Sequence, residues 1–465
     1  MEKGQTRPPI VVVLGHVDHG KTTLLDAVRK TNVASREAGG ITQGIGASVI
    51  STKEGKKITF IDTPGHAAFT KMRSRGAKLA DIAVLVVASD DGVKPQTKEA
   101  LQIIRQASVP FVVALTKIDL PHADVEAVKG QLEKEGVAFE ARGGDVPVVA
   151  LSAKTGKGID ELLETISLVA EMHEIKASPA GPLEVVVLET SKDKSGLLVS
   201  VVVRNGTLKV GQSVSGEGRL VKIRGLFKEG KKAIREALPS EPAQILGFET
   251  LPSVGTLITS SGQSVLVSQK PKEVRVKVER GQIPIMVKAQ SEGALEAVLA
   301  SAPPGVVSVS SGVGDVYESD VLLAKSSGIP RIFCFESKAS PAVLKLAEAE
   351  GVRIEIFRVI YELLQRLEEL VKKAEVEVLG RAEVVAQFPF NNKKVAGCRV
   401  VSGQISKTDR LLVLRGEKKL GEVKVVSLKK QKQEISLAKV GEEFGIVFEP
   451  QLDFDVGDVL VSVAK

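Results

Sequence analysis

The stretch GHVDHGKT (residues 15–22) decides the fold of the first part of the chain. It follows the apolar run IVVVL (residues 10–14) and leads into TTLLDAVRK, which has a helical pattern. This strand, glycine-bounded loop and helix match the phosphate-binding loop, in which backbone N–H groups and a helix N-terminus face phosphate oxygens. Lys21 can reach the β- and γ-phosphates, and the Thr22 hydroxyl suits Mg²⁺. The phosphate-binding residues predicted here are Asp18, His19, Gly20, Lys21, Thr22 and Thr23.

Apolar, β-branched runs recur from Ile10 to about His173 and alternate with helical stretches. The runs are IVVVLG, ITFID, IAVLVVAS, PFVVALT and VPVVAL. Strands that are apolar along their whole length are typical of a parallel sheet buried on both faces. The pattern predicts a doubly wound α/β domain over residues 1–176.

Two segments after the loop suit a site that responds to a γ-phosphate. In DTPG (residues 62–65), Asp62 can hold Mg²⁺ through water, and Gly65 can offer its N–H to the phosphate and swing when that group leaves. His66 follows and can orient the attacking water; the alternative is a turn residue on a mobile loop. In the glycine-rich stretch GGITQGIG (residues 39–46), Thr42 is predicted to contact Mg²⁺ and the γ-phosphate.

Base selection is predicted at the ends of two later strands. Asp119 in TKID (residues 116–119) can accept hydrogen bonds from the ring N–H and the amine of guanine, a pair that adenine lacks. The stem of Lys117 can lie over the base. A backbone N–H of Ser152, Ala153 or Lys154 can meet the guanine oxygen. Thr116 stands where Asn is usual, and we expect this to weaken a loop-bracing hydrogen bond.

The rest of the chain divides into four predicted parts. KASPAGP is a linker signal, and short strands with glycine turns then predict a β-barrel over residues 177–270. Strands and helices alternate over residues 271–357, where Ser291 can cap one helix and Gly351 can end another. A leucine stripe predicts a linker helix over residues 358–375. Residues 376–465 echo the first barrel in order, which predicts a second, related barrel.

Composition restricts the class of protein further. The net charge of +7 and the pI near 9.1 suit a phosphate-rich partner such as RNA, but many soluble proteins are as basic. Two cysteines without metal-ligand spacing favour a reducing compartment and therefore the cytoplasm. The apolar run after the polar start is too short for a signal peptide or membrane span, so no membrane partner is expected.

Taken in order, these motifs resemble a translational GTPase. GHVDHGKTTLLDAVRK, AGGITQGIGA, FIDTPGHAAFTKMRSRGAKLAD and LSAKTGKGIDELLE are similar to bacterial translation initiation factor two in particular. The resemblance continues in NGTLKVGQ, SGVGDVYESDVLLA and LAEAEGVRIEIFRVIYELL, and ends in VLGRAEV, VAGCRVVSG and SLKKQK. It covers essentially residues 8–465.

The resemblance implies a P-loop GTPase domain, a β-barrel, an α/β/α domain, a long linker helix and a C-terminal β-barrel. It implies a monomer that hydrolyses GTP to GDP with Mg²⁺, with His66 at the catalytic position and Asp18 near a monovalent cation. Implied partners are the 30S and 50S ribosomal subunits, other initiation factors and initiator formylmethionyl-tRNA. The factor would stabilise this tRNA on the small subunit, promote subunit joining and leave after ribosome-stimulated hydrolysis. The tRNA-end pocket would involve Cys398, Lys430, Glu443, Phe444 and Gly445.

Three positions depart from the family pattern. Gly44 stands where His is usual, Phe444 where Cys is common, and Gln431 where an aromatic residue is usual. The last two alter the implied pocket, and a Cys398 buried in a barrel core is the alternative to a binding role. Two other functions stay open: an elongation-type carrier of charged tRNA, and a GTP-dependent scaffold for ribosome assembly. The segments at 285–356 and 358–375 disfavour the carrier, and His66 disfavours a non-hydrolysing scaffold.

Overall fold

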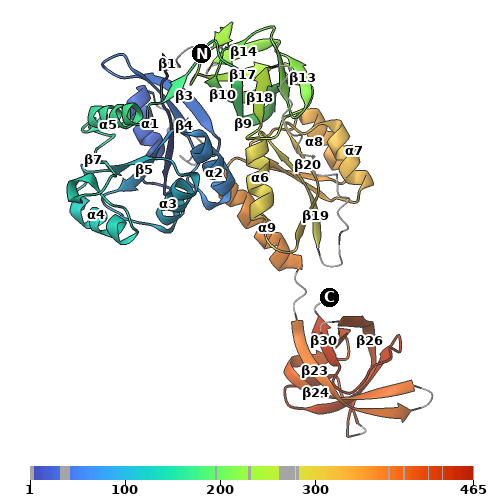
Figure 1. Cartoon of the computed structure of the whole chain (residues 1–465). Helices are drawn as coiled ribbons and strands as arrows, with labels where there is room; N and C mark the ends of the chain where they lie inside the picture. The colour runs from blue at the N-terminus through green and yellow to red at the C-terminus, as the bar shows by residue number, and fades with distance from the viewer. Residues whose placement is uncertain are drawn as a thin grey trace. The chain divides into compact units, whose positions relative to one another are not determined.

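The computed structural model describes residues 5–31, 42–193, 196–228, 232–260, 278, 282–374, 378–390, 393–416, 418–431 and 433–463. The chain forms two compact units, Met1–Glu368 and Glu369–Lys465 (Figure 1). The expected boundaries at 270/271 and 375/376 lie outside the described residues, as does nearly all of the expected strand VRVKV (residues 274–278).

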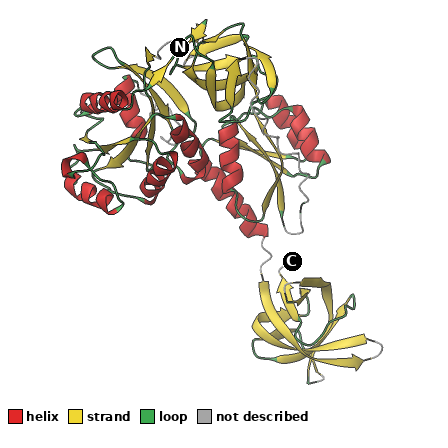
Figure 2. Cartoon of the chain, in the orientation of Figure 1, coloured by secondary structure: helices red, strands yellow, loops and turns green. Residues whose placement is uncertain are grey.

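A six-stranded sheet is the frame of the first unit, in the order β3-β4-β2-β5-β6-β7. Its strands run parallel except β3, which pairs antiparallel with β4. The strands are β2 (Ile10–Gly15), β3 (Gly46–Ser51), β4 (Lys57–Asp62), β5 (Ile82–Ala88), β6 (Phe111–Thr116) and β7 (Val148–Ala150). The helices are α1 (Lys21–Arg29), α2 (Thr70–Leu79), α3 (Pro95–Ala107), α4 (Val125–Lys134) and α5 (Ile159–Met172), with the 3₁₀ turns η2 (Ala67–Phe69) and η3 (Glu140–Arg142). Figure 2 shows these helices on both sides of the sheet.

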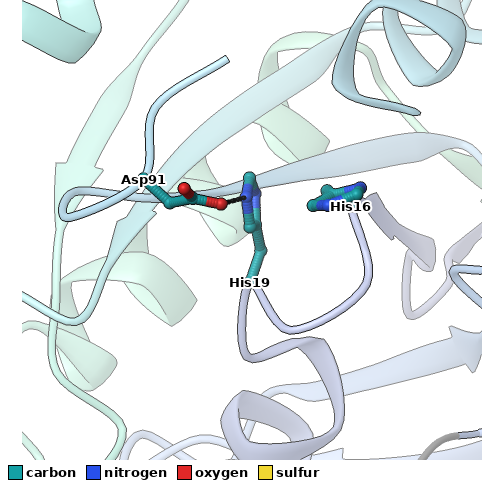
Figure 3. Close-up of side chains that lie close together, drawn as sticks. All are labelled: His16, His19 and Asp91. Carbon is teal, nitrogen blue, oxygen red and sulfur yellow. Dashed lines mark hydrogen bonds and ion pairs between the residues drawn. The ribbon is translucent and has the colours of Figure 1, made fainter. Parts of the chain in front are cut away.

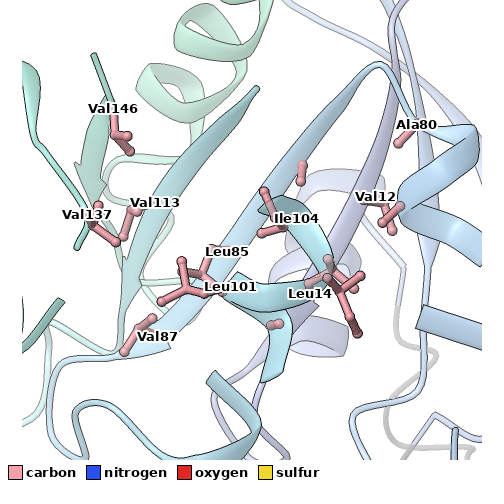
Figure 4. Packing of buried hydrophobic residues seen from close by; sticks show 14 of the residues in the cluster. Val12, Leu14, Ala80, Leu85, Val87, Leu101, Ile104, Val113, Val137 and Val146 are labelled. Carbon is pink, nitrogen blue, oxygen red and sulfur yellow. The ribbon is translucent and has the colours of Figure 1, made fainter. Parts of the chain in front are cut away.

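The sheet is buried on both faces, as its apolar strands predict. In β2, Val12 and Leu14 join the core shown in Figure 4, whereas Val11 and Val13 join the core on the other face. Alternation along one strand therefore feeds two hydrophobic cores. Gly15 ends β2 with φ of 153°, and a Cβ there would lie 2.4 Å from the carbonyl oxygen of Val86 on β5. Only glycine fits this start of the phosphate-binding loop.

Ten strands follow the nucleotide domain and, apart from the pair β11–β16, form one antiparallel sheet around a single core. They are β9 (Glu184–Asp193), β10 (Gly196–Asn205), β11 (Leu208–Lys209), β12 (Ser213–Gly216), β13 (Arg219–Lys222), β14 (Gly225–Lys228), β15 (Lys232–Ile234), β16 (Glu236–Ala237), β17 (Pro242–Leu246) and β18 (Leu257–Ser260). Arg7, between β1 (Gln5–Thr6) and β2, ties this barrel to the sheet, because its guanidinium contacts Asp81 at 2.7 Å and Ser240 at 3.0 Å. The pair of β1 with β8 (Lys176–Ala177) adds to this junction.

A four-stranded parallel sheet comes next, in the order β20-β19-β21-β22. Helix α6 covers one face, and α7 and α8 cover the other (Figure 1). The Ser291 hydroxyl caps α6 as expected, and Gly351 follows α8 with φ of 71°. The elements are β19 (Ile283–Ala289), α6 (Glu292–Ser301), β20 (Val306–Val313), α7 (Glu318–Ser326), β21 (Arg331–Phe335), α8 (Pro341–Ala349) and β22 (Arg353–Phe357).

The linker helix is α9 (Ile360–Ala374), and its predicted stripe is largely buried. Ile360, Leu363 and Leu367 are fully buried and Leu370 nearly so, whereas Leu364 is half-buried. Within the part of the chain that the structure describes, no helix is both long and apolar enough to cross a lipid bilayer.

The second unit is a closed antiparallel barrel, because β23 pairs with both β30 and β24. Its strands are β23 (Val378–Phe390), β24 (Lys393–Ser406), β25 (Arg410–Arg415), β26 (Lys418–Lys430), β27 (Gln433–Glu434), β28 (Leu437–Lys439), β29 (Glu443–Glu449) and β30 (Val459–Val463). The pairings match those of the first barrel, with β24 in the place of β10 and β11 together and β26 in the place of β13 and β14 together. Shared pairing order supports the predicted repeat.

Candidate nucleotide-binding site

A cavity of about 360 Å³ opens where the carboxyl ends of the parallel strands β2, β4 and β6 meet the loops that follow them. Ligands of open α/β sheets bind at this edge. Almost every predicted nucleotide-site residue lines the cavity. The lining is Val17, Asp18, Gly20, Lys21, Thr22, Thr23, Thr42, Gly65, His66, Thr116, Lys117, Asp119, Leu120, Ala153 and Lys154.

The phosphate-binding loop is held in an unusual backbone conformation. Asp18 has φ of 63° and Gly20, directly before α1, has φ of 87°. Lys21 is buried, and its Nζ donates to the carbonyl oxygen of His16 at 2.6 Å. Burial lowers the pKa of Lys21 to about 8, and the Asp62 carboxylate opposes that shift. An ammonium group held with little water around it is a strong binding group for a phosphate anion.

The two threonines predicted as metal ligands meet at the mouth of this loop. Thr22 Oγ1 and Thr42 Oγ1 lie 2.7 Å apart. Thr42 is the first described residue after the gap that contains Gly39 and Gly40. Asp62 is buried at the end of β4, close enough to Lys21 to influence its charge. Two hydroxyls and a nearby carboxylate form the all-oxygen set that Mg²⁺ prefers, so the residues present fit that metal.

Gly65 and His66 form the opposite wall of the cavity. A Cβ on Gly65 would lie 2.5 Å from Lys21 Nζ and 3.2 Å from the backbone nitrogen of Val17, so a larger residue here would displace the lysine from its position. The His66 ring accepts a hydrogen bond through Nδ1 from the N–H of Ala68 at 3.0 Å, which leaves Nε2 as the nitrogen available to a substrate. Burial, together with the charge of Arg73, lowers the pKa of His66. A neutral imidazole can accept a hydrogen bond from water.

The residues predicted to bind the guanine base also lie close together. The Ser152 side chain hydrogen bonds to Asp119 and lowers the pKa of that carboxyl, with a smaller effect from Lys154. Lys117, with φ of 60°, places its Nζ 3.7 Å from Asp90. Ser152 does not line the cavity; it influences the site through its hydrogen bond to Asp119. An ionised, exposed carboxylate at this end can accept two hydrogen bonds from one edge of a base.

Thr116 forms a loop-bracing hydrogen bond, although we expected threonine at this position to weaken it. The buried Thr116 hydroxyl donates to the carbonyl oxygen of His19 at 2.7 Å and so ties β6 to the phosphate-binding loop. A β-branched side chain has restricted rotation about χ1, which helps to hold the hydroxyl toward this partner. Threonine therefore supplies the brace despite its shorter side chain.

His19 lies in the phosphate-binding loop, but its side chain turns away from the cavity. Figure 3 shows it between His16 and Asp91, with its Nε2 3.4 Å from the Asp91 carboxylate. Burial is the main cause that lowers its pKa to about 4. The three side chains offer ligand atoms within 4.8 Å of one another. Because Lys94 pairs with Asp91 at 2.7 Å and the charge of Lys21 acts on His19, the cluster braces the loop and does not suit a cation.

Sequence patterns missed several residues that hold the site. Arg73 on α2 is buried and donates to the carbonyl oxygens of Pro64 and His66 at 2.9 and 2.5 Å, which fixes the loop between them. Gln96 on α3 accepts the N–H of Val17 at 2.9 Å. The burial of the charged Arg73 marks its role, and the role of Gln96 is marked only by its contact; both are properties of the fold.

Three models of known protein families match successive parts of the chain. The model of the elongation factor Tu GTP-binding domain matches residues 6–172, that of elongation factor G domain 2 matches 182–261, and that of translation-initiation factor 2 matches 261–368. Translation initiation factor IF-2 of Thermotoga sp. strain RQ2 is 42% identical over 98% of this chain and 71% of its own length. IF-2 of Aquifex aeolicus is 39% identical over 98% of this chain and 60% of its own.

The chain belongs to the translation initiation factor IF-2 family. It is therefore a translation initiation factor with a guanine-nucleotide-binding GTPase domain. A crystal structure of GDP-bound aIF5B from Aeropyrum pernix is 27% identical and covers 98% of this chain and 92% of its own, with a TM-score of 0.48.

The pocket that the IF-2 resemblance implies falls on one hollow of the second barrel. All five predicted residues line it. Cys398 and Phe444 are register partners on β24 and β29, and both are buried in the barrel core. Burial raises the pKa of Cys398 to about 12, which favours the protonated thiol over the nucleophilic thiolate. Lys430 and Glu443 instead point outward and pair with Glu442 at 2.7 Å and Arg399 at 3.0 Å.

Proposed function

We propose that the cavity binds GTP with Mg²⁺ and hydrolyses it when the chain reaches the ribosome during initiation. The observation that carries the proposal is the convergence of separate motifs on one cavity, with Thr22 and Thr42 hydroxyls 2.7 Å apart beside Lys21. Thr22 lies in the first turn of α1 and Thr42 in the loop before β3, so their meeting is a property of the fold and not of one motif. Binding a common metal ion is the function that such a pair of hydroxyls suits best.

The phosphates would lie along the loop from Asp18 to Thr23, with Lys21 and the N-terminus of α1 facing their charge. Thr22 and Thr42 would contact Mg²⁺, and Asp62 would hold it through water. The metal would supply positive charge for the phosphoryl oxygens. Lys117, Asp119, Ser152, Ala153 and Lys154 would select guanine. A monovalent cation near Asp18 belongs to the same proposal.

His66 is the proposed catalytic residue. Its Nδ1 is occupied by the Ala68 N–H, so Nε2 can accept a hydrogen bond from the attacking water. Gly65 would offer its N–H to the γ-phosphate, which would couple the position of His66 to the presence of that group. Because phosphoryl transfer has little covalent chemistry for the protein to perform, holding the water in line is the main task.

The remaining partners follow from the family. The chain would act in the cytoplasm with the 30S and 50S subunits, initiator formylmethionyl-tRNA and other initiation factors. The net charge of +7 suits contact with ribosomal RNA. We place the end of the tRNA at the hollow of the second barrel, with Lys430 and Glu443 at its surface and Gly445 in its lining.

The test is GTP turnover by the whole chain, alone and with 70S ribosomes, for the wild type and His66→Ala. We expect slow turnover alone and strong stimulation by ribosomes. His66→Ala should bind GTP nearly normally and lose stimulated turnover by about 10²–10⁴-fold, the usual contribution of a positioned acid or base. Unchanged turnover in His66→Ala would remove this residue from the mechanism. A wild type that ribosomes do not stimulate would instead favour the assembly scaffold.

A further inference from the structure

The first turn of α9 lies against both loops that the proposed function assigns to the γ-phosphate. Gln43, the residue after Thr42, is buried with 4% of its surface exposed. Its Nε2 donates to the carbonyl oxygen of Arg358 at 2.7 Å, and its Oε1 accepts the N–H of Ile360 at 3.0 Å. One amide side chain therefore grips the backbone on both sides of the helix start. The Ile360 N–H is one of those that a helix cannot satisfy internally.

The residue after Ile360 reaches the other loop. The ring of Tyr361 meets the ring of His66 edge to face, with centroids 4.2 Å apart and planes at 87°. Phe69 contacts the same imidazole more distantly, at 6.1 Å. Tyr361 is half exposed, and the charge of Asp18 in the phosphate-binding loop acts on its hydroxyl. The tyrosine thus stands at the rim of the cavity, close to two of its walls.

These contacts form one connected path through the described residues. Thr42 lies at the proposed metal position, its neighbour Gln43 fixes the backbone at Arg358 and Ile360, and this placement brings Tyr361 onto His66. An edge-to-face aromatic contact restricts the imidazole more than solvent would. The N–H of Ala68 already holds Nδ1 of His66. The tyrosine therefore limits the remaining rotation of the imidazole ring, and this rotation sets the position of Nε2.

We infer that Tyr361 is a positioning residue for His66, and that Gln43 places Tyr361 by holding the start of α9. The inference rests on the proposed catalytic role of His66. The first turn of α9 is then part of the GTPase site, although it lies almost 300 residues beyond the DTPG loop in the sequence. The contact is between the two rings, so phenylalanine at this position should act like tyrosine.

The test is a double-mutant cycle on the full chain with 70S ribosomes and GTP, read as single-turnover release of labelled phosphate. Tyr361→Ala should lower stimulated turnover by about three- to tenfold, the size of one aromatic pair. The KM for GTP should stay within about twofold, since Tyr361 is absent from the cavity lining. Tyr361→Phe should restore turnover, and Gln43→Ala should lower it like Tyr361→Ala. In a His66→Ala background, Tyr361→Ala should cause no further loss.

The chain supplies a matched control in its other tyrosine. Tyr317, at the start of α7, is 46% exposed against 47% for Tyr361 and touches neither loop. Tyr317→Ala should leave stimulated turnover unchanged. The inference is overturned if Tyr361→Ala leaves turnover unchanged or raises it, if Tyr361→Phe fails to restore it, or if the loss is equal with and without His66. Failure of the proposed function itself would appear separately, as full activity in the single variant His66→Ala.

Discussion

The nucleotide cavity is lined by most of the residues expected there, without His19, Asp62 and Ser152, and the hollow of the second barrel is lined by all five, yet the two are built differently. The cavity is made of loops that leave the ends of parallel strands, so neighbours in sequence such as Lys21 and Thr22 face the same space. The hollow lies on an antiparallel barrel, where successive residues alternate between core and surface. Phe444 therefore enters the core while its neighbour Glu443 points outward. In the cavity, a sequence motif predicts directly which side chains face the ligand. In the barrel, the same prediction also requires the register of the strands.

The largest effect that would sharpen this comparison is a change of base preference at the cavity. Asp119→Asn inverts one donor–acceptor pair, so we expect preference to move from GTP toward xanthosine triphosphate by roughly a thousandfold. Competitive binding of the two nucleotides measures it. Ser152→Ala serves as the partner variant, since it loosens Asp119 without changing its chemistry and should only weaken both nucleotides modestly. An unaltered preference for GTP in Asp119→Asn would show that another group selects the base.

In the second barrel, a single substitution should instead lower the local stability of the fold. Phe444 is 4% exposed and packs in the core, so Phe444→Ala should cost about 3 kcal/mol of local stability. Hydrogen exchange of the β24 and β29 amides in the full chain would report it. Phe388 also lines the hollow but is 56% exposed, so Phe388→Ala should leave this protection nearly intact. Equal losses in the two variants would contradict the division into an inward and an outward face.

A smaller effect concerns the charge of Lys21. Burial lowers its pKa to about 8, and a bound triphosphate favours the charged form. Above pH 8 a growing share of the free protein holds Lys21 neutral, so binding must take up a proton and affinity must fall as pH rises. GTP should bind about fourfold more weakly at pH 8.5 than at pH 7, with proton uptake detectable by calorimetry in two buffers. Affinity that is flat over this range, with no uptake, would contradict a lowered pKa at this lysine.

A structural feature could be predicted from the sequence when the residues that determine it lie close together in the chain. The five parallel strands of the first sheet, the loop around Lys21, the cap at Ser291 and the stripe of α9 follow from residues close together in the chain. The antiparallel strand β3 was not predicted. The buried roles of Arg73 and Gln43 depend on partners in other elements, 317 residues away for the Gln43–Ile360 hydrogen bond. No pattern within a window contains such pairs. Helix α7 was also missed, because its run ESDVLLAKS has a weak apolar stripe and the N-cap position is occupied by Tyr317, which is not a usual capping residue.

The same distinction explains the departures from the family pattern. Thr116 keeps the brace to His19 because its carbonyl partner belongs to a loop fixed by Gly15 and Gly20. Phe444 in place of the common cysteine fills a core position opposite Cys398, so its first effect is on packing. Neither outcome could be predicted from residue type alone. Both required the register of strands that the chain brings together over long separations.

The most direct test of the account is a crystal structure of the chain with Mg²⁺ and a non-hydrolysable GTP analogue. We expect the triphosphate to lie against Lys21 and the start of α1, the metal to contact Thr22 and Thr42, and guanine to bind Asp119. A triphosphate bound away from Lys21 and Thr22, or no binding at this cavity, would contradict it.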